Sequence, residues 1–127
     1  MSERPLSPHL QIYRWQITSV LSILHRGSGI ALAAATPLYV LWLVSVALGD
    51  ASFALVRAGF ASWPGQAVLV ACSFAGTYHL FNGLRHLLWD MGVGFSPSFV
   101  ARSGVMIAYG SLALTCTAWT LVWLTHG

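Results

Sequence analysis

Apolar residues form three long stretches along the chain, and short polar segments separate them. The stretches cover residues 27–49, 63–84 and 103–127, and none of them contains Asp, Glu, Lys or Arg. A helix that crosses a bilayer needs roughly 20 largely apolar residues, so each stretch is long enough to span. The expected transmembrane helices cover about residues 21–48, 64–90 and 103–126.

The composition supports a membrane protein with almost no mass outside the bilayer. Of the 127 residues, 57% are hydrophobic and only 7% are charged, which is too little charge to cover the surface of a soluble domain. We therefore predict an all-α integral membrane protein, with residues 1–127 forming a single transmembrane domain.

The polar segments predict the connections between the helices. Residues 1–20 contain Pro5 and Pro8, which disfavour a helix, so this segment is expected to be an arm that lies along the membrane interface. The first loop, at about residues 50–63, is expected to contain a short surface helix. The motif "MGVGFSPSF" is expected to form the second turn.

The arginines predict the orientation in the membrane. Five of the six lie before the first helix or around the second loop, and only Arg57 lies in the first loop. Positive charge favours the cytoplasmic side, so the N-terminus is expected there. Neither a cleavable signal peptide nor a transit peptide is evident at the start. The expected location is the bacterial inner membrane, in preference to the mitochondrial inner membrane.

One predicted helix face combines histidine with glycine. Gly76, His79, Gly83 and His86 follow a 3, 4, 3 spacing, which places them on one side of a helix. An ionisable residue inside a span indicates a functional site, and the glycines leave room for a large flat group such as a b-type haem. The same face is also typical of close helix packing, with His79 donating a hydrogen bond to a neighbouring helix.

The other four histidines lie near helix ends or in the arm. If His79 binds a six-coordinate haem, the second axial ligand is therefore expected from a partner subunit.

A second group of polar residues is predicted at the cytoplasmic ends of the first two helices. Ser22, His25 and Arg26 share a face of the first helix, at the level of Arg85 and His86 on the second. These five residues are expected to form a cationic, hydrogen-bonding shelf. Such a shelf suits haem propionates or the carbonyl oxygens of a quinone. Anchoring of the helices at the interface by long polar side chains is the alternative.

Two motifs resemble those of the cytochrome b556 subunits of succinate dehydrogenase, which are membrane anchors of respiratory complex II. They are "RPLSPHLQIY" followed by "SILHRGS", and "HLFNGLRHLLWDMG". The resemblance covers about a third of the chain directly. It implies a bundle in which these three helices pair with a second anchor subunit.

The resemblance also implies roles for particular residues. His79 matches the haem iron ligand of the family, and His25, Arg26 and His86 match positions near the haem propionates. Ser22 and Arg26 match quinone-site positions where the chemistry takes place.

Two further positions, Trp15 and Ile23, match residues that line the quinone pocket of the family.

The implied function is that of a haem b-binding anchor of succinate:ubiquinone oxidoreductase, in electron transport and the tricarboxylic acid cycle. Its implied partners are a second anchor subunit, an iron–sulfur subunit and a flavoprotein subunit, and no nucleic acid. The chain would contribute to a quinone site without containing a complete active site. The alternatives are the anchor of a quinol:fumarate reductase and a haem-free structural anchor.

Overall fold

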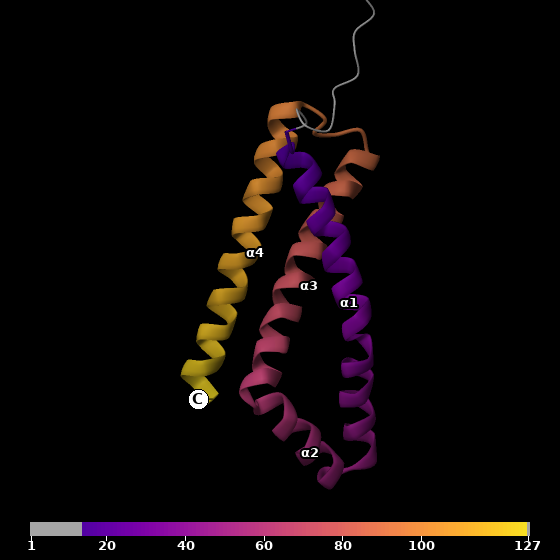
Figure 1. Ribbon diagram of the computed structural model, residues 1–127, viewed down its shortest axis with the longest axis vertical. Helices are drawn as coiled ribbons and strands as arrows, with labels where there is room; N and C mark the ends of the chain where they lie inside the picture. The colour runs from indigo at the N-terminus through magenta and orange to yellow at the C-terminus, as the bar shows by residue number, and fades with distance from the viewer. Residues whose placement is uncertain (1–13, 127) are drawn as a thin grey trace, which may run out of the picture.

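The computed structural model describes residues 14–126. Within this range the chain forms four helices and no strand: α1 (Ile17–Leu48), α2 (Asp50–Ala61), α3 (Trp63–Asp90) and α4 (Pro97–His126). Figure 1 shows α1, α3 and α4 as long helices, with the short α2 joining α1 to α3 at one end. These three are long and apolar enough to cross a membrane, so the predicted all-α membrane fold with three spans is confirmed.

Two of the helices begin earlier than the sequence indicated. α1 starts at Ile17 instead of residue 21, and α4 starts at Pro97 instead of residue 103. The apolar stretches mark the segment that suits the hydrocarbon core, whereas a helix continues through polar residues at its ends. The last residues of the expected arm therefore belong to α1. Residues 1–13 of that arm lie outside the described range.

The connection between α1 and α3 depends on two local features. Gly49 has a φ of 100°, a conformation that favours glycine, and it allows α2 to start directly after α1. Ser62 then caps α3, because its Oγ accepts a hydrogen bond from the backbone N–H of Gly65 at 3.3 Å. Pro64 lies in the first turn of α3, where its missing N–H leaves no helical bond unmade.

The start of α1, the end of α3 and the start of α4 lie together at one end of the molecule (Figure 1). Arg14, Arg85 and Arg102 belong to this end, which we call the arginine end, whereas Arg57 lies on α2 at the other. The interior is unusually polar. The buried residues described are Leu21, Ser45, Tyr78, Asn82, Arg85, Gly104, Ser111 and Thr115. Polar interiors and apolar surfaces suit helices that pack against one another in lipid.

Close packing at the arginine end depends on Gly104 of α4. A Cβ atom at this position would overlap Cδ1 of Leu21 and lie 2.6 Å from Nη1 of Arg85. We expect Gly104→Ala to push α4 away from α1 and α3 and to destabilise the subunit by about 1–3 kcal/mol, as overpacking does. A lower midpoint for heat-induced unfolding of the detergent-solubilised protein would measure the effect.

The matched control is Gly110→Ala, also on α4. A Cβ at Gly110 would meet nothing within 4 Å, so this variant should keep or slightly raise the midpoint. Equal midpoints for the two variants would show that Gly104 is not a close contact.

Candidate functional site

His79 is a half-buried residue of α3 whose ring is held by α1. Its Nδ1 lies 3.3 Å from the backbone oxygen of His25 and 3.2 Å from the hydroxyl oxygen of Ser28. The Ser28 hydroxyl donates its own proton to the same His25 oxygen at 2.7 Å. Nδ1–H of His79 is therefore the donor toward this pair, which leaves Nε2 with its lone pair.

This arrangement resembles the hydrogen-bonded support that proteins give to histidine metal ligands. Histidines that bind a metal through one ring nitrogen usually donate the other ring N–H to a carbonyl or carboxylate, which fixes the ring and its tautomer. Among the described residues no group of three or more His, Cys, Asp or Glu side chains is arranged to hold a metal ion. A metal bound by His79 would therefore need further ligands from outside this part of the chain.

Two further histidines form a row with His79. The ring of His25 lies 4.5 Å from the ring of His79 and 4.9 Å from that of His86, between centroids. Nδ1 of His86 lies 2.8 Å from the backbone oxygen of Asn82, which directs Nε2 away from its own helix. Nε2 of His25 is buried and has no hydrogen-bond partner among residues 14–126. The row thus contains a buried polar atom that a bound group could satisfy.

The glycine that accommodates the His79 ring is Gly29 of α1. A Cβ at Gly29 would lie 2.9 Å from Cε1 of His79, which is closer than two carbon atoms can pack. The glycines predicted from the α3 face differ: a Cβ at Gly83 would meet nothing within 4 Å, and one at Gly76 would only touch Leu32 at 3.9 Å. Gly83 therefore leaves open space beside the ring, and Gly29 sets where the ring lies.

The Gly29→Ala variant should displace the imidazole while leaving the fold intact, because the end of a side chain yields more easily than a helix backbone. If His79 binds haem, its hold on the iron should weaken by about 10-fold or more, as when a supporting partner of a metal ligand is altered. The haem-to-protein ratio of the purified complex and its low-temperature EPR spectrum would measure this.

Gly27→Ala provides the matched control on the same helix, since a Cβ there meets nothing within 4 Å. It should retain the haem content and EPR spectrum of the parent complex. If Gly29→Ala also retains both, Gly29 does not position the ring.

Ser22 and Arg26 form a separate pair on α1. Nη2 of Arg26 donates a hydrogen bond to Oγ of Ser22 at 3.2 Å. Because the oxygen accepts from Arg26, the Ser22 hydroxyl proton can be donated outward. Arg26 is exposed and Ser22 is partly buried, so both reach the surface of the chain near the arginine end. The pair offers the positive charge and N–H donors of Arg26 and the O–H donor of Ser22, which can bind an anion or a carbonyl oxygen.

Arg85 does not join the predicted shelf. It is only 6% exposed, its Nη1 donates to the backbone oxygen of Val100 at 3.3 Å, and its guanidinium lies 4.7 Å from the ring centre of Trp89. Arg85 and His86 are consecutive residues of α3, so their side chains point in different directions around the helix. The side chain of Arg85 points toward α4. Asp90 is exposed and forms no ion pair with Arg85 or His86. The shelf thus consists of residues from α1 and His86.

The two predicted pocket-lining residues lie at the surface. Trp15 precedes α1 and is 67% exposed, and Ile23 on α1 is 50% exposed. The described contacts do not bring Ile23 into the histidine row or the Ser22–Arg26 pair.

Two residues of the site were not identified from the sequence. Ser28 and Gly29 follow His25 by three and four positions, so all three share a face of α1. If this face of α1 had been matched with the histidine face of α3, the spacing would have indicated that Ser28 and Gly29 contact His79.

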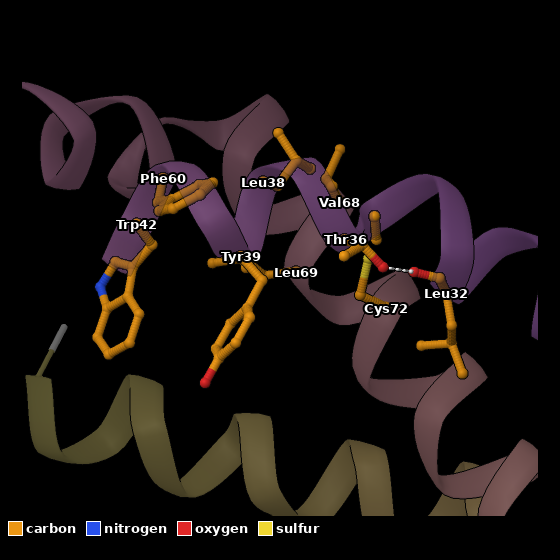
Figure 2. Close-up of a pocket in the computed structure, with 10 residues that line it drawn as sticks. Leu32, Thr36, Leu38, Tyr39, Trp42, Phe60, Val68, Leu69 and Cys72 are labelled. Carbon is orange, nitrogen blue, oxygen red and sulfur yellow. Dashed lines mark hydrogen bonds between the residues drawn. The ribbon is translucent and has the colours of Figure 1, made fainter. Parts of the chain in front are cut away.

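A cavity of about 580 Å³ lies away from these polar groups, between α1, α2 and α3. Figure 2 shows Tyr39 and Trp42 of α1, Phe60 of α2 and Cys72 of α3 among its walls. The Thr36 hydroxyl, also in the wall, donates to the Leu32 backbone oxygen at 3.2 Å. The lining is largely apolar and contains no carboxylate, histidine or arginine.

Comparisons with known proteins agree on one family. Residues 1–118 match the family model for the succinate dehydrogenase/fumarate reductase transmembrane subunit. The chain is 42% identical over 118 residues to the succinate dehydrogenase cytochrome b556 subunit of Rickettsia conorii, covering 93% of this chain and 92% of that protein. It is 39% identical over 111 residues to the Paracoccus denitrificans subunit of the same name, covering 87% and 85%. Identity to the mitochondrial cytochrome b560 subunit of Mus musculus is 40% over 111 residues, covering 84% and 64%.

Proposed function

Because this chain belongs to the succinate dehydrogenase/fumarate reductase transmembrane subunit family, we propose that it is a haem b-binding membrane anchor of a succinate:ubiquinone oxidoreductase. The observation that carries the proposal is the hydrogen-bonded His79, whose Nδ1 is held by His25 and Ser28 so that Nε2 is free to bind iron.

The residues around His79 fit a haem. A haem iron already has four ring nitrogens, so one imidazole from this chain and one from a partner subunit complete its coordination. The open space beside Gly83 admits a flat macrocycle, and the buried Nε2 of His25 needs a hydrogen-bond partner such as a propionate. When bound, haem supplies a one-electron carrier inside the membrane. Arg26 and His86 would hold its carboxylates by charge and hydrogen bonds.

The quinone-reducing part of the site is proposed at Ser22 and Arg26. Arg26 would stabilise the negative charge that develops on a quinone oxygen as electrons arrive, and Ser22 would donate its hydroxyl proton in a hydrogen bond to that oxygen. Trp15 and Ile23 would cover the quinone ring together with groups from neighbouring subunits. Trp15, Ile23 and Arg26 are exposed and Ser22 is partly buried, which supports a pocket that is completed only in the complex.

The partners proposed are a second anchor subunit, an iron–sulfur subunit and a flavoprotein subunit. A complex purified through a tag on this chain should contain all three and reduce a soluble ubiquinone analogue when given succinate. Recovery of the chain without these subunits would refute the proposal. Faster fumarate reduction by quinol than succinate oxidation would instead assign the complex to the reverse reaction.

We further propose that the arginine end faces the cytoplasm, as the distribution of positive charge predicts. In a background with both cysteines replaced by serine, a membrane-impermeant maleimide added to intact spheroplasts should label Ser52→Cys on α2 and leave Ser96→Cys, beside α4, unlabelled. After lysis both should react. The opposite labelling pattern would reverse the orientation.

A further inference from the structure

A groove of about 290 Å³ lies where α2, α3 and α4 meet, at the end of the molecule opposite the arginine end. Its walls include Arg57 and Phe60 of α2, Leu69 of α3 and Val122 of α4. α4 runs antiparallel to α3, so its last turns lie toward the end of the molecule that holds α2 (Figure 1). The groove shares no residue with the proposed haem and quinone sites.

Most polar side chains of the groove are hydrogen-bonded to other groups of the chain. Nε1 of Trp123 donates to Oε1 of Gln66 at 3.1 Å, and Nε2 of Gln66 donates to the Ala61 backbone oxygen at 3.1 Å. Nε1 of Trp119 donates to Oγ of Ser73 at 3.2 Å, and the two indole rings lie 5.8 Å apart between centroids. These bonds fix both indoles and the Gln66 amide as walls of the groove.

Arg57 is the exception among the polar side chains of the groove. Its side chain is exposed, and it has no hydrogen-bond or ion-pair partner among residues 14–126. Asp50, the other charged residue of α2, lies two helical turns earlier and forms no ion pair with it. A guanidinium has five N–H donors in a planar fork that matches the oxygens of a phosphate. The groove therefore combines apolar walls with one unpaired positive charge.

The position of α2 places Arg57 at the level of lipid headgroups. α1 ends at Leu48 and α3 begins at Trp63, and both helices are long and apolar enough to cross a membrane. The helix that joins them therefore lies where the two spans leave the hydrocarbon core. No residue of α2 is buried in the chain, as suits a helix that lies in the membrane interface.

We propose that this groove binds an anionic phospholipid, whose phosphate pairs with Arg57 while an acyl chain lies against Leu69 and Val122. The occupant needs both parts, because a free anion leaves the apolar walls uncovered and a neutral apolar molecule leaves the guanidinium unpaired. No carboxylate lines the groove, so nothing there attracts the amine of a zwitterionic headgroup. Basic pockets between transmembrane helices bind acidic headgroups by the same charge pairing.

The neighbouring cavity gives room for a second acyl chain of the same lipid. Phe60 and Leu69 line both the groove and the apolar cavity of about 580 Å³ between α1, α2 and α3, so the two spaces adjoin. A phospholipid with its phosphate at Arg57 can therefore place one chain on each side of these two residues.

Native mass spectrometry tests the role of Arg57. Protein purified through a tag on this chain is stripped of lipid in a non-ionic detergent and titrated with phosphatidylglycerol. Arg57→Gln should weaken the tightest binding step by about tenfold or more, the loss expected when a charged group loses a hydrogen-bonding partner. Arg57 is exposed and has no partner among the described residues, so the substitution should leave the fold intact.

Arg102→Gln is the matched control, because Arg102 is also an exposed arginine but lies at the arginine end. It should bind phosphatidylglycerol as the parent does, and phosphatidylethanolamine should not distinguish Arg57→Gln from the parent. Equal phosphatidylglycerol binding by the parent and Arg57→Gln would overturn the proposal. Equal losses in the two arginine variants would do so as well, since they would reflect general charge attraction.

A second pair of variants tests the apolar part of the groove while keeping Arg57. Ala61→Trp should fill the groove, because Ala61 is one of its walls, and should weaken phosphatidylglycerol binding about as much as Arg57→Gln. Ala58→Trp adds the same ring to an exposed position of α2 that lines none of the described cavities, and binding should be unchanged. Full binding by Ala61→Trp would show that no acyl chain occupies the groove.

A cryo-EM map of the protein in nanodiscs that contain phosphatidylglycerol would locate the lipid. The expected result is a headgroup peak with a phosphate oxygen about 3 Å from the Arg57 guanidinium, continuous with chain density between α3 and α4. An empty groove, a compact ion without chain density, another subunit or the carboxyl end of this chain at Arg57 would each overturn the proposal.

Discussion

Replacing His79 with glycine is expected to remove the b-type α band from the reduced-minus-oxidised spectrum of the purified complex. The ring nitrogen Nε2 is the atom that this chain offers to iron, and glycine leaves only a hole at that position. Haem content should fall to a small fraction of the parent value, or the remaining haem should show a five-coordinate spectrum. A visible spectrum and a pyridine haemochrome assay on the same sample would measure both effects.

Chemical rescue separates a ligand role from a packing role for His79. Free imidazole can enter the hole left by His79→Gly and should restore the α band, because it supplies the missing nitrogen without restoring the side chain. His86→Ala is the comparison variant. The Nδ1 of His86 is engaged by the Asn82 backbone and its ring lies 4.8 Å from Trp89, so loss of this ring should keep the α band and shift only the haem potential.

A parent complex that contains no haem would refute the haem assignment and leave His79 as a hydrogen-bonding residue between α1 and α3. Full retention of the six-coordinate spectrum by His79→Gly without imidazole would refute the ligand role specifically.

The spans were predictable from the sequence because the hydrocarbon core requires about 20 apolar residues, and that requirement is visible as uncharged stretches. The starts of α1 and α4 were not predictable from hydropathy. A helix includes polar residues, such as Ser98 and Arg102 in α4, wherever its backbone hydrogen bonds continue. Hydropathy records which residues suit lipid and does not record where helical bonding stops.

The site was only partly predictable, for a similar reason. The 3, 4, 3 spacing placed His79 and His86 on one face of α3, since spacing fixes faces within a helix. How two helices are rotated against each other depends on packing, so the sequence did not indicate that Gly29 rather than Gly76 lies against the ring. The same rotation turned Arg85 into the interface with α4, whereas its level at the helix ends had suggested a common shelf with His86, Ser22, His25 and Arg26.

Arg26→Ala is expected to lower kcat/KM for ubiquinone by about 10²-fold or more, the size of effect seen when one preorganised donor to a developing oxyanion is removed. Arg26 acts in two ways in the proposed site. It supplies charge to the quinone oxygen, and it donates to Oγ of Ser22 at 3.2 Å, which orients the Ser22 hydroxyl proton outward. Ser22→Ala removes only the hydroxyl and should have a smaller effect.

Because Arg26 positions Ser22, the two substitutions should not be additive: the double variant should be little worse than Arg26→Ala alone. Succinate oxidation with a soluble dye, which takes electrons before they reach the membrane, should be unchanged in all three variants. Arg102→Ala, an exposed arginine of α4 at the same end, should leave both activities unchanged. Equal losses of quinone and dye reduction in Arg26→Ala would mean that Arg26 holds the complex together, since only a quinone-site residue affects the two acceptors differently.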